Sequence, residues 1–181
     1  MTTQNTTLLE KFCRRLPVRW MAMLPPCRRC LLEKDPVILF LGASITRGYG
    51  LRKQYAYPQK IQQFLNDAGA TYHVINGAQN GASTVHGLMQ MHPFLQDGVN
   101  LQYLVIGLGS ADAAYKTPIE KIDKNISQIV EIARMFNPDI KIFLFQHRVF
   151  QSPGRDKLDP MYKAKYALIF EAVAARENLI L

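Results

Sequence analysis

A continuous apolar run at residues 37–42, VILFLG, is the feature that most constrains the fold. An uninterrupted run of this length is typical of a strand in a parallel sheet whose two faces are both covered, because neither face of such a strand meets water. Similar runs follow at residues 72–77 (YHVING), 101–109 (LQYLVIGLG) and 141–146 (KIFLFQ). The sequence therefore predicts a mostly parallel central sheet.

Segments with helical periodicity separate these runs. In residues 118–136 isoleucines recur on one face, with Thr117 predicted as the N-cap and Pro118 as the first helical residue. Further helices are predicted at residues 57–68, 84–96 and 160–177, and the final residues 178–181 (NLIL) read as a fifth strand. The alternation of strands and helices indicates an α/β domain.

A basic arm precedes this pattern. The 181-residue chain has a formal net charge of +8, and half of that charge lies in residues 1–36. The basic side chains there are Lys11, Arg14, Arg15, Arg19, Arg28, Arg29 and Lys34. We expect residues 1–35 to form an N-terminal arm and residues 36–181 to form one α/β domain, with the junction near Asp35-Pro36.

The arm also carries apolar side chains, which leaves two interpretations. It is either a solvated, partly helical extension, or a segment that lies on an anionic membrane surface or an acidic protein partner. Its apolar residues are Leu16, Val18, Trp20, Met21, Met23 and Leu24. Nucleic-acid binding is disfavoured, because no aromatic and basic pattern continues into the domain. We expect a cytoplasmic chain, with the arm as a route to peripheral membrane attachment, because no apolar stretch approaches the ~18 residues of a membrane span.

The cysteines do not indicate a disulfide framework or a metal site. Cys13, Cys27 and Cys30 all fall in the arm, and their number is odd. Cys27 and Cys30 form a CxxC pair, but no second pair accompanies it, as a structural zinc site requires. We expect neither a metal nor a cofactor.

Small and polar residues follow three of the predicted strands. Ser44 comes directly after the first strand; Gly77 and Gly81 follow the second within VINGAQNGAST; the third runs into Gly109-Ser110-Ala111-Asp112. The carboxyl ends of parallel strands meet at one edge of a sheet, where ligands bind in such folds. Taken alone, Ser44 is read as an ordinary helix N-cap, but the convergence of three such loops favours a reactive site.

These three blocks, in this order, resemble those of the SGNH (GDSL-type) hydrolases, most closely the lysophospholipase, thioesterase and arylesterase branch. The resemblance covers residues 36–181 and implies a flavodoxin-like, three-layer α/β/α fold with about five strands. It places the nucleophile at Ser44 in the block Gly42-Ala43-Ser44-Ile45. It also implies hydrolysis of small ester, thioester or lysolipid substrates through an acyl-enzyme on Ser44, with no metal or cofactor.

The resemblance implies an oxyanion hole that is incomplete here. Its donors are the backbone N–H groups of Ser44 and Gly81 and, in the family, the asparagine of a Gly-x-Asn-Asp block. Ala111 stands at that asparagine's position, before Asp112. Asp112 is interpreted either as an acceptor that orients a loop or as a contact to substrate.

The family's Asp-x-x-His block, which supplies the general base, has no match in the 181 residues. No aspartate stands three residues before any histidine; the histidines are His73, His86, His92 and His147. Among them, His147 is expected nearest the site because it follows the fourth strand. Two hypotheses remain: a serine esterase that is shortened or takes its base from elsewhere, or a catalytically impaired relative that binds an acyl ligand or serves as an assembly module.

Overall fold

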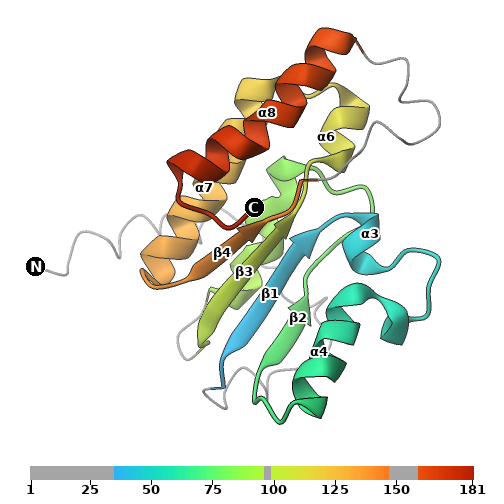
Figure 1. Ribbon diagram of the computed structural model, residues 1–181, viewed down its shortest axis with the longest axis vertical. Helices are drawn as coiled ribbons and strands as arrows, with labels where there is room; N and C mark the ends of the chain where they lie inside the picture. Colours follow the sequence, from blue (N-terminus) through green and yellow to red (C-terminus); the bar gives the residue numbers. More distant parts are fainter. Residues whose placement is uncertain (1–34, 96–98, 147–158) are drawn as a thin grey trace, which may run out of the picture.

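The computed structural model describes residues 35–95, 99–146 and 159–181 (Figure 1). A parallel sheet of four strands forms its centre, in the order β2-β1-β3-β4. The strands are β1 (Val37–Gly42), β2 (His73–Asn76), β3 (Leu101–Gly107) and β4 (Lys141–Leu144). All four predicted apolar runs are therefore strands, and the predicted parallel sheet is confirmed. Most of the predicted arm lies outside the described residues.

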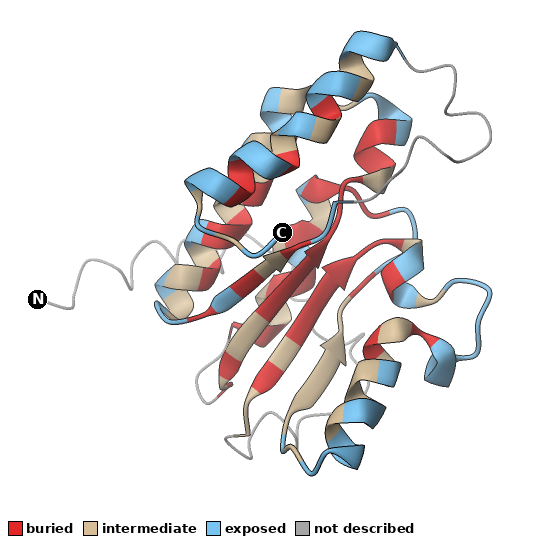
Figure 2. Cartoon of the chain, in the orientation of Figure 1, coloured by how far each residue is buried: buried red, intermediate tan, exposed pale blue. Residues whose placement is uncertain are grey.

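Helices cover the sheet and give a three-layer α/β/α fold. They are α3 (Ser44–Arg47), η2 (Lys53–Tyr55), α4 (Tyr57–Asp67), η3 (Thr84–His86), α5 (Gly87–Met91), η4 (His92–Phe94), α6 (Ser110–Tyr115), α7 (Ile119–Phe136) and α8 (Pro160–Arg176). On one face, α5 and α7 enclose the main core, in which Leu39, Leu104 and Ile129 are fully buried. On the other face α4 packs against β2. In Figure 2 the buried residues run along β1 and β3, whereas β2 at the sheet edge is only half-buried.

Two helix predictions need correction. The helix predicted over residues 84–96 is divided into η3, α5 and η4, and Pro93 near the start of η4 cannot donate a backbone hydrogen bond to a longer helix. The long helix α7 begins at Ile119, with Pro118 rather than Thr117 in the cap position. Pro118 has ψ 137°, which is outside the helical range.

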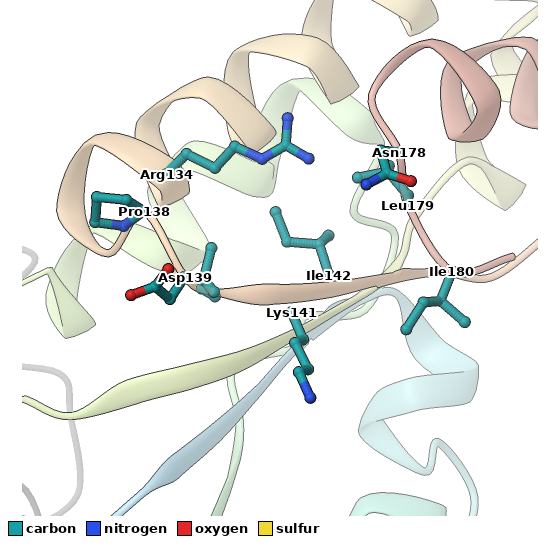
Figure 3. A pocket seen from close by; sticks show the side chains of 9 residues that line it. Arg134, Pro138, Asp139, Lys141, Ile142, Asn178, Leu179 and Ile180 are labelled. Carbon is teal, nitrogen blue, oxygen red and sulfur yellow. The ribbon is translucent and has the colours of Figure 1, made fainter.

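The predicted fifth strand is not confirmed. Within the described residues, Ile180 forms a single parallel bridge with Phe143. The Ile180 N–H donates to Ile142 O at 3.0 Å, and the Leu144 N–H donates to Ile180 O at 2.8 Å. One residue of residues 178–181 thus pairs with β4, which is too little for a strand. A surface pocket of about 520 Å³ lies beside this bridge, between the end of α7, the start of β4 and the segment Asn178 to Ile180 (Figure 3).

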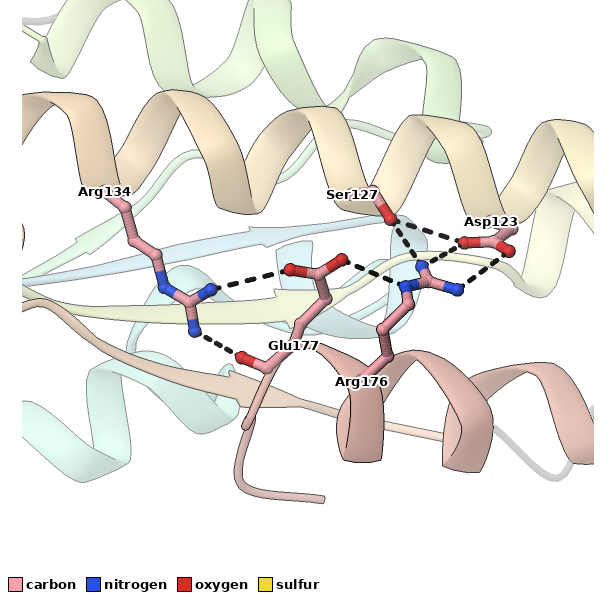
Figure 4. Close-up of polar contacts among 5 residues, drawn as sticks. All are labelled: Asp123, Ser127, Arg134, Arg176 and Glu177. Carbon is pink, nitrogen blue, oxygen red and sulfur yellow. Dashed lines mark hydrogen bonds and ion pairs between the residues drawn. The ribbon is translucent and has the colours of Figure 1, made fainter.

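Ionic contacts fasten the end of α8 to α7 (Figure 4). Arg176 donates to both carboxylate oxygens of Asp123, at 2.5 and 3.2 Å, and to Ser127 Oγ at 2.7 Å. Glu177 pairs with Arg176 at 3.2 Å and with Arg134 at 3.5 Å. These side chains are partly exposed, so solvent screens their attraction. None of the helices in the described ranges is both long and apolar enough to cross a membrane.

The free energy of unfolding should depend more on the apolar core than on this ionic cluster. Ile129→Ala should lower it by about 2–5 kcal/mol, because the substitution leaves a cavity at a fully buried position. Arg176→Ala should lower it by less than about 1 kcal/mol, because the ion pairs are exposed to water. Urea unfolding of both variants measures the difference; a larger loss for Arg176→Ala would contradict this assignment.

Candidate active site

Ser44 lies where β1 passes into α3. It is the first residue of α3, Ala43 occupies the cap position, and no side chain caps this helix. The interpretation of Ser44 as an ordinary N-cap is therefore wrong. Its side chain is half-buried, and no hydrogen bond to its hydroxyl is present within the described residues. The backbone carbonyl of Ser44 accepts from the N–H groups of Gly48 and Tyr49, at 3.0 and 2.9 Å, which fixes the short helix behind the hydroxyl.

Thr46, the third residue of α3, is fully buried and bonds the helix to its neighbours. Its Oγ1 accepts a 3.1 Å hydrogen bond from the Tyr57 hydroxyl, and its carbonyl accepts a 2.8 Å bond from Asn76 Nδ2. Burial raises the pKa of Tyr57, and the bond to Thr46 offsets part of that rise. A Cβ on Gly42 would lie 2.1 Å from Thr46 Oγ1, so this turn needs glycine at position 42.

Gln90, on α5, holds the end of β1 from the other side. Its side-chain Oε1 accepts from the Gly42 N–H at 2.9 Å, and its Nε2 donates to the Gly42 carbonyl at 3.0 Å. The side chain is 2% exposed, so both bonds are shielded from water. Sequence reasoning did not single out Gln90; the available signal was a glutamine within the apolar segment LMQM.

The loop after β2 runs beside the end of β1. The Gly77 N–H donates to Phe40 O at 2.9 Å, and the Gln79 N–H donates to Gly42 O at 3.0 Å. A tight turn follows, closed by the Ala82 N–H to Gln79 O at 3.2 Å, with Gly81 in the turn at φ +74°. No atom lies within 4 Å of a Cβ built at Gly81, so lack of space does not require glycine there. The positive φ is what favours glycine at this position. The turn that carries Gly81 is thus bonded to a residue two positions before Ser44.

Asp112 joins the loop after β3 to the loop after β2. Its two carboxylate oxygens accept from the Thr84 N–H and the Thr84 hydroxyl, both at 2.7 Å. The Asp112 side chain is 1% exposed, and burial raises its pKa above the usual 3.8 although the bonds from Thr84 oppose that shift. The three loops expected at the carboxyl edge of the sheet are therefore connected by hydrogen bonds. These contacts are those of an acceptor that connects two loops, one of the two interpretations of Asp112 given above.

Two helices extend this polar network. Asn125 Nδ2 on α7 donates to Thr84 Oγ1 at 2.9 Å. The Tyr162 hydroxyl on α8 donates to the backbone carbonyls of Thr117 and Asp112, at 3.0 and 3.4 Å. Burial, and then the charge of Asp112, raises the pKa of Tyr162 to about 12. The buried Thr84 and the half-buried Asn125 and Tyr162 are partners that sequence analysis missed, because only the folded chain brings them together.

Ala111 is the predicted site residue that lacks the chemistry expected of its position. It lies in α6, next to Asp112, and is 8% exposed. A methyl group cannot donate a hydrogen bond, so position 111 offers no side-chain donor. Gly109, which precedes α6, has φ +119°, and a Cβ there would lie 2.6 Å from Phe170 Cζ of α8.

Two of the described histidines have partners other than Ser44. His73 Nε2 lies 3.1 Å from Asp35 Oδ2, at the amino end of β2 and so at the opposite edge of the sheet. His86 Nδ1 accepts from the Ser83 N–H at 3.1 Å. His92 is half-buried in η4, and burial lowers its pKa. The other predicted auxiliary residue, His147, lies outside the described residues.

The pocket beside β4 does not belong to this edge. Its lining includes Pro138, Asp139 and Lys141, which lie where β4 begins, whereas Ser44 lies where β1 ends. Within the described ranges, no group of three or more His, Cys, Asp or Glu side chains is arranged to hold a metal ion. Among the described residues, the carboxyl edge carries the half-buried Ser44 hydroxyl, the backbone amides of the loops beside it and the buried carboxylate of Asp112.

A three-layer α/β/α fold with a serine directly after its first strand defines the class to which this chain belongs. The GDSL-like Lipase/Acylhydrolase family matches residues 40–181. This match covers most of the chain, and the chain is a member of that family.

Individual relatives agree with the family match. An arylesterase of Vibrio mimicus is 26% identical over 136 residues, which are 75% of this chain and 66% of the arylesterase. The crystal structure of TesA superposes with a TM-score of 0.68 at 25% identity, covering 79% of this chain and 75% of TesA. AlinE4, an SGNH-hydrolase family esterase, superposes with a TM-score of 0.69 at 27% identity, covering 81% of this chain and 75% of AlinE4. The chain thus spans less than two thirds of the arylesterase.

The buried carboxylate of Asp112 should give the folding stability a characteristic pH dependence. Its raised pKa means that the folded state binds this proton more tightly than the unfolded state does. Stability contributed at Asp112 therefore falls as pH rises from about its usual pKa through the raised value. Asp112→Asn removes this titration and keeps a side-chain acceptor for Thr84.

Urea unfolding at a series of acidic pH values measures the effect. The stability of the wild type relative to Asp112→Asn should decrease as pH rises through that interval. A difference that grows with pH would mean that the bonds from Thr84 outweigh burial.

Proposed function

We propose that this chain carries the nucleophile and part of the oxyanion hole of a serine esterase. One observation supports this most directly: Ser44 begins a helix at the end of β1, and the turn containing Gly81 is bonded to Gly42 beside it. Family membership and the likeness to the esterase AlinE4 support hydrolysis of carboxylic esters as the reaction.

In the proposed reaction, Ser44 Oγ attacks the ester carbonyl carbon and loses its proton to a general base. A bond forms between Oγ and the carbonyl carbon, and the backbone N–H groups of Ser44 and Gly81 stabilise the negative charge on the carbonyl oxygen. The bond to the alcohol then breaks, and the alcohol takes up the proton. Water hydrolyses the acyl-enzyme by the same route, which releases a carboxylic acid and restores Ser44.

The proposed reaction needs a general base to accept the proton of Ser44 Oγ. A triad without its histidine retains an acceleration of only about 10³–10⁴ over water. His147 is our candidate, because it follows β4 closely and strand carboxyl ends share the edge with Ser44.

We propose small aryl or short acyl esters as the first substrates to test. The arylesterase relative supports this choice. Thioesters and lysolipids belong to the same proposal, because the attack on the carbonyl carbon is the same and only the leaving group differs. The proposed site is local to this chain and needs neither a metal nor a cofactor.

One structural observation favours a second candidate function. Ala111 is buried and supplies no hydrogen bond where the resemblance implies an asparagine donor. Loss of one such donor lowers the rate by about 10²–10³. A catalytically impaired relative that binds an acyl ligand at the same edge is the alternative.

Labelling by a fluorophosphonate probe tests the nucleophile. The wild type should be labelled and should hydrolyse short p-nitrophenyl esters, and Ser44→Ala should abolish both, because the probe bonds to an activated serine oxygen. Ser110→Ala is the matched control; Ser110 is half-buried at the start of α6 and should leave labelling unchanged. Labelling that persists in Ser44→Ala would exclude Ser44, and a wild type that is never labelled would favour the ligand-binding alternative.

Restoring the missing donor tests the oxyanion hole. Ala111→Asn should raise the rate of ester hydrolysis by up to about 10², because the amide N–H₂ stabilises the developing oxyanion. The rate is measured with p-nitrophenyl acetate, and Ala111→Leu, which adds similar volume without a donor, serves as the control. Equal rates in the two variants would show that position 111 does not face the reacting oxygen.

A further inference from the structure

The described helices leave one face of the sheet partly exposed over β3 and β4. Tyr103 pairs in register with Lys141, and Val105 pairs with Phe143. Partners in a parallel sheet point to the same side, so these four side chains share one face, and Phe145 continues it two residues further along. We call Tyr103, Lys141, Phe143 and Phe145 the aromatic face.

The two faces of β4 differ sharply in burial. Ile142 and Leu144, which point toward α7, are 4% and 0% exposed. On the aromatic face, Phe143 is half-buried, Lys141 is exposed and Phe145 is 41% exposed. Figure 3 shows Lys141 and Ile142 on opposite sides of β4. Parallel strands are normally covered on both faces, and in the part of the chain that the structure describes no helix covers this part of the sheet as α7 covers the opposite face.

Three half-buried rings, those of Tyr72, Tyr103 and Phe143, form a row of contacts on this side of the sheet. The Tyr103 and Phe143 rings lie 6.4 Å apart, and Tyr72 packs edge-on against Tyr103 at 5.7 Å. At the carboxyl end, Phe145 lies 6.4 Å from Tyr57 of α4. The helix α4 packs over β2, and the aromatic face continues the sheet beside it. A contiguous aromatic surface of this kind marks a place where another segment packs.

We propose that the N-terminal arm docks on the aromatic face, through the segment Val18 to Leu24. That segment reads VRWMAML, with one charged residue among large apolar ones, which suits an aromatic surface. The arm enters the domain at Asp35, which is bonded to His73 at the amino end of β2, near Tyr72. The arm therefore joins the domain close to Tyr72, which lies next to the aromatic face.

Chain length permits this contact. The ten residues between Leu24 and Asp35 give eleven steps from one residue to the next, which can extend over roughly 35 Å. The distance from β1 to β4 is two strand spacings, about 10 Å. Because the arm is covalently attached, docking is intramolecular, and the effective concentration of the segment at the face is high. The inference does not depend on the reactivity of Ser44.

The fluorescence of Trp20, the only tryptophan in the chain, reports directly on this docking. In the intact protein its emission should be blue-shifted, and its quenching by acrylamide at least threefold weaker, relative to a peptide of residues 1–34. Phe143→Ser should move both values toward those of the peptide. Phe64→Ser, at a residue that is 76% exposed on α4, should not. Far-UV circular dichroism verifies that each variant is folded.

Cross-linking gives a second test that leaves the aromatic side chains intact. All three cysteines of the chain lie in the arm, so a single new cysteine on the domain can be linked only to the arm or to another molecule. With a short bismaleimide, Lys141→Cys should give an intramolecular cross-link in at least fivefold higher yield than Lys124→Cys. Lys124 is the control because it is an exposed lysine on α7, across the sheet.

Several outcomes would overturn the proposal. Emission of the intact protein equal to that of the peptide, or equal cross-link yields at positions 141 and 124, would show that the arm does not dock. A blue shift that grows with protein concentration, together with intermolecular cross-links, would assign the aromatic face to a second copy of the chain. A shift that occurs only on addition of phosphatidylserine vesicles would assign the arm to a membrane surface instead.

Discussion

The backbone of Gly42 is the point on which the carboxyl edge of this domain depends. Its carbonyl accepts from the Gln79 N–H and from Gln90 Nε2, while its N–H donates to Gln90 Oε1. The two bonds to Gln90 are buried, so breaking one leaves a polar group without water or partner, which costs more than the bond contributes when formed. With the bond from Gln79, they hold the end of β1, the loop after β2 and α5 together, and Ser44 follows two residues later.

A second buried set of hydrogen bonds connects the loops at the carboxyl ends of β2 and β3. Asp112 binds Thr84 through both oxygens, which joins the loops after β2 and β3. Helix α8 contributes from outside: the Tyr162 hydroxyl bonds to the loop after α6 through Thr117, and Phe170 packs where a Cβ on Gly109 would stand. The edge that carries the proposed nucleophile is therefore supported from both neighbouring strands and from the helix layer. Such support holds catalytic groups in a fixed geometry.

Sequence reasoning succeeded where a local pattern has a single structural solution. The apolar run of β1 can be buried only in a covered strand, and the isoleucine stripe of α7 predicts the buried face that Ile122, Ile126 and Ile129 form. It failed for two segments near the ends of elements. Residues 84–96 were predicted as one helix because apolar periodicity continues through Pro93, where the helix is interrupted. Residues 178–181 were predicted as a strand because an apolar run does not show how few of its residues pair with β4.

The candidate site also has a part that local sequence patterns predict and a part that they do not. The sequence by itself determined which residue types follow each strand, and hence that Ser44, Gly81 and Asp112 share one edge, because parallel strands align their carboxyl ends. Only the tertiary structure decided which groups hold that edge in place. Gln90 lies 48 residues from Gly42, and Thr84 lies 28 residues from Asp112. A hydrogen bond between residues so far apart in sequence leaves no local pattern, since it forms only after both segments have packed on the sheet.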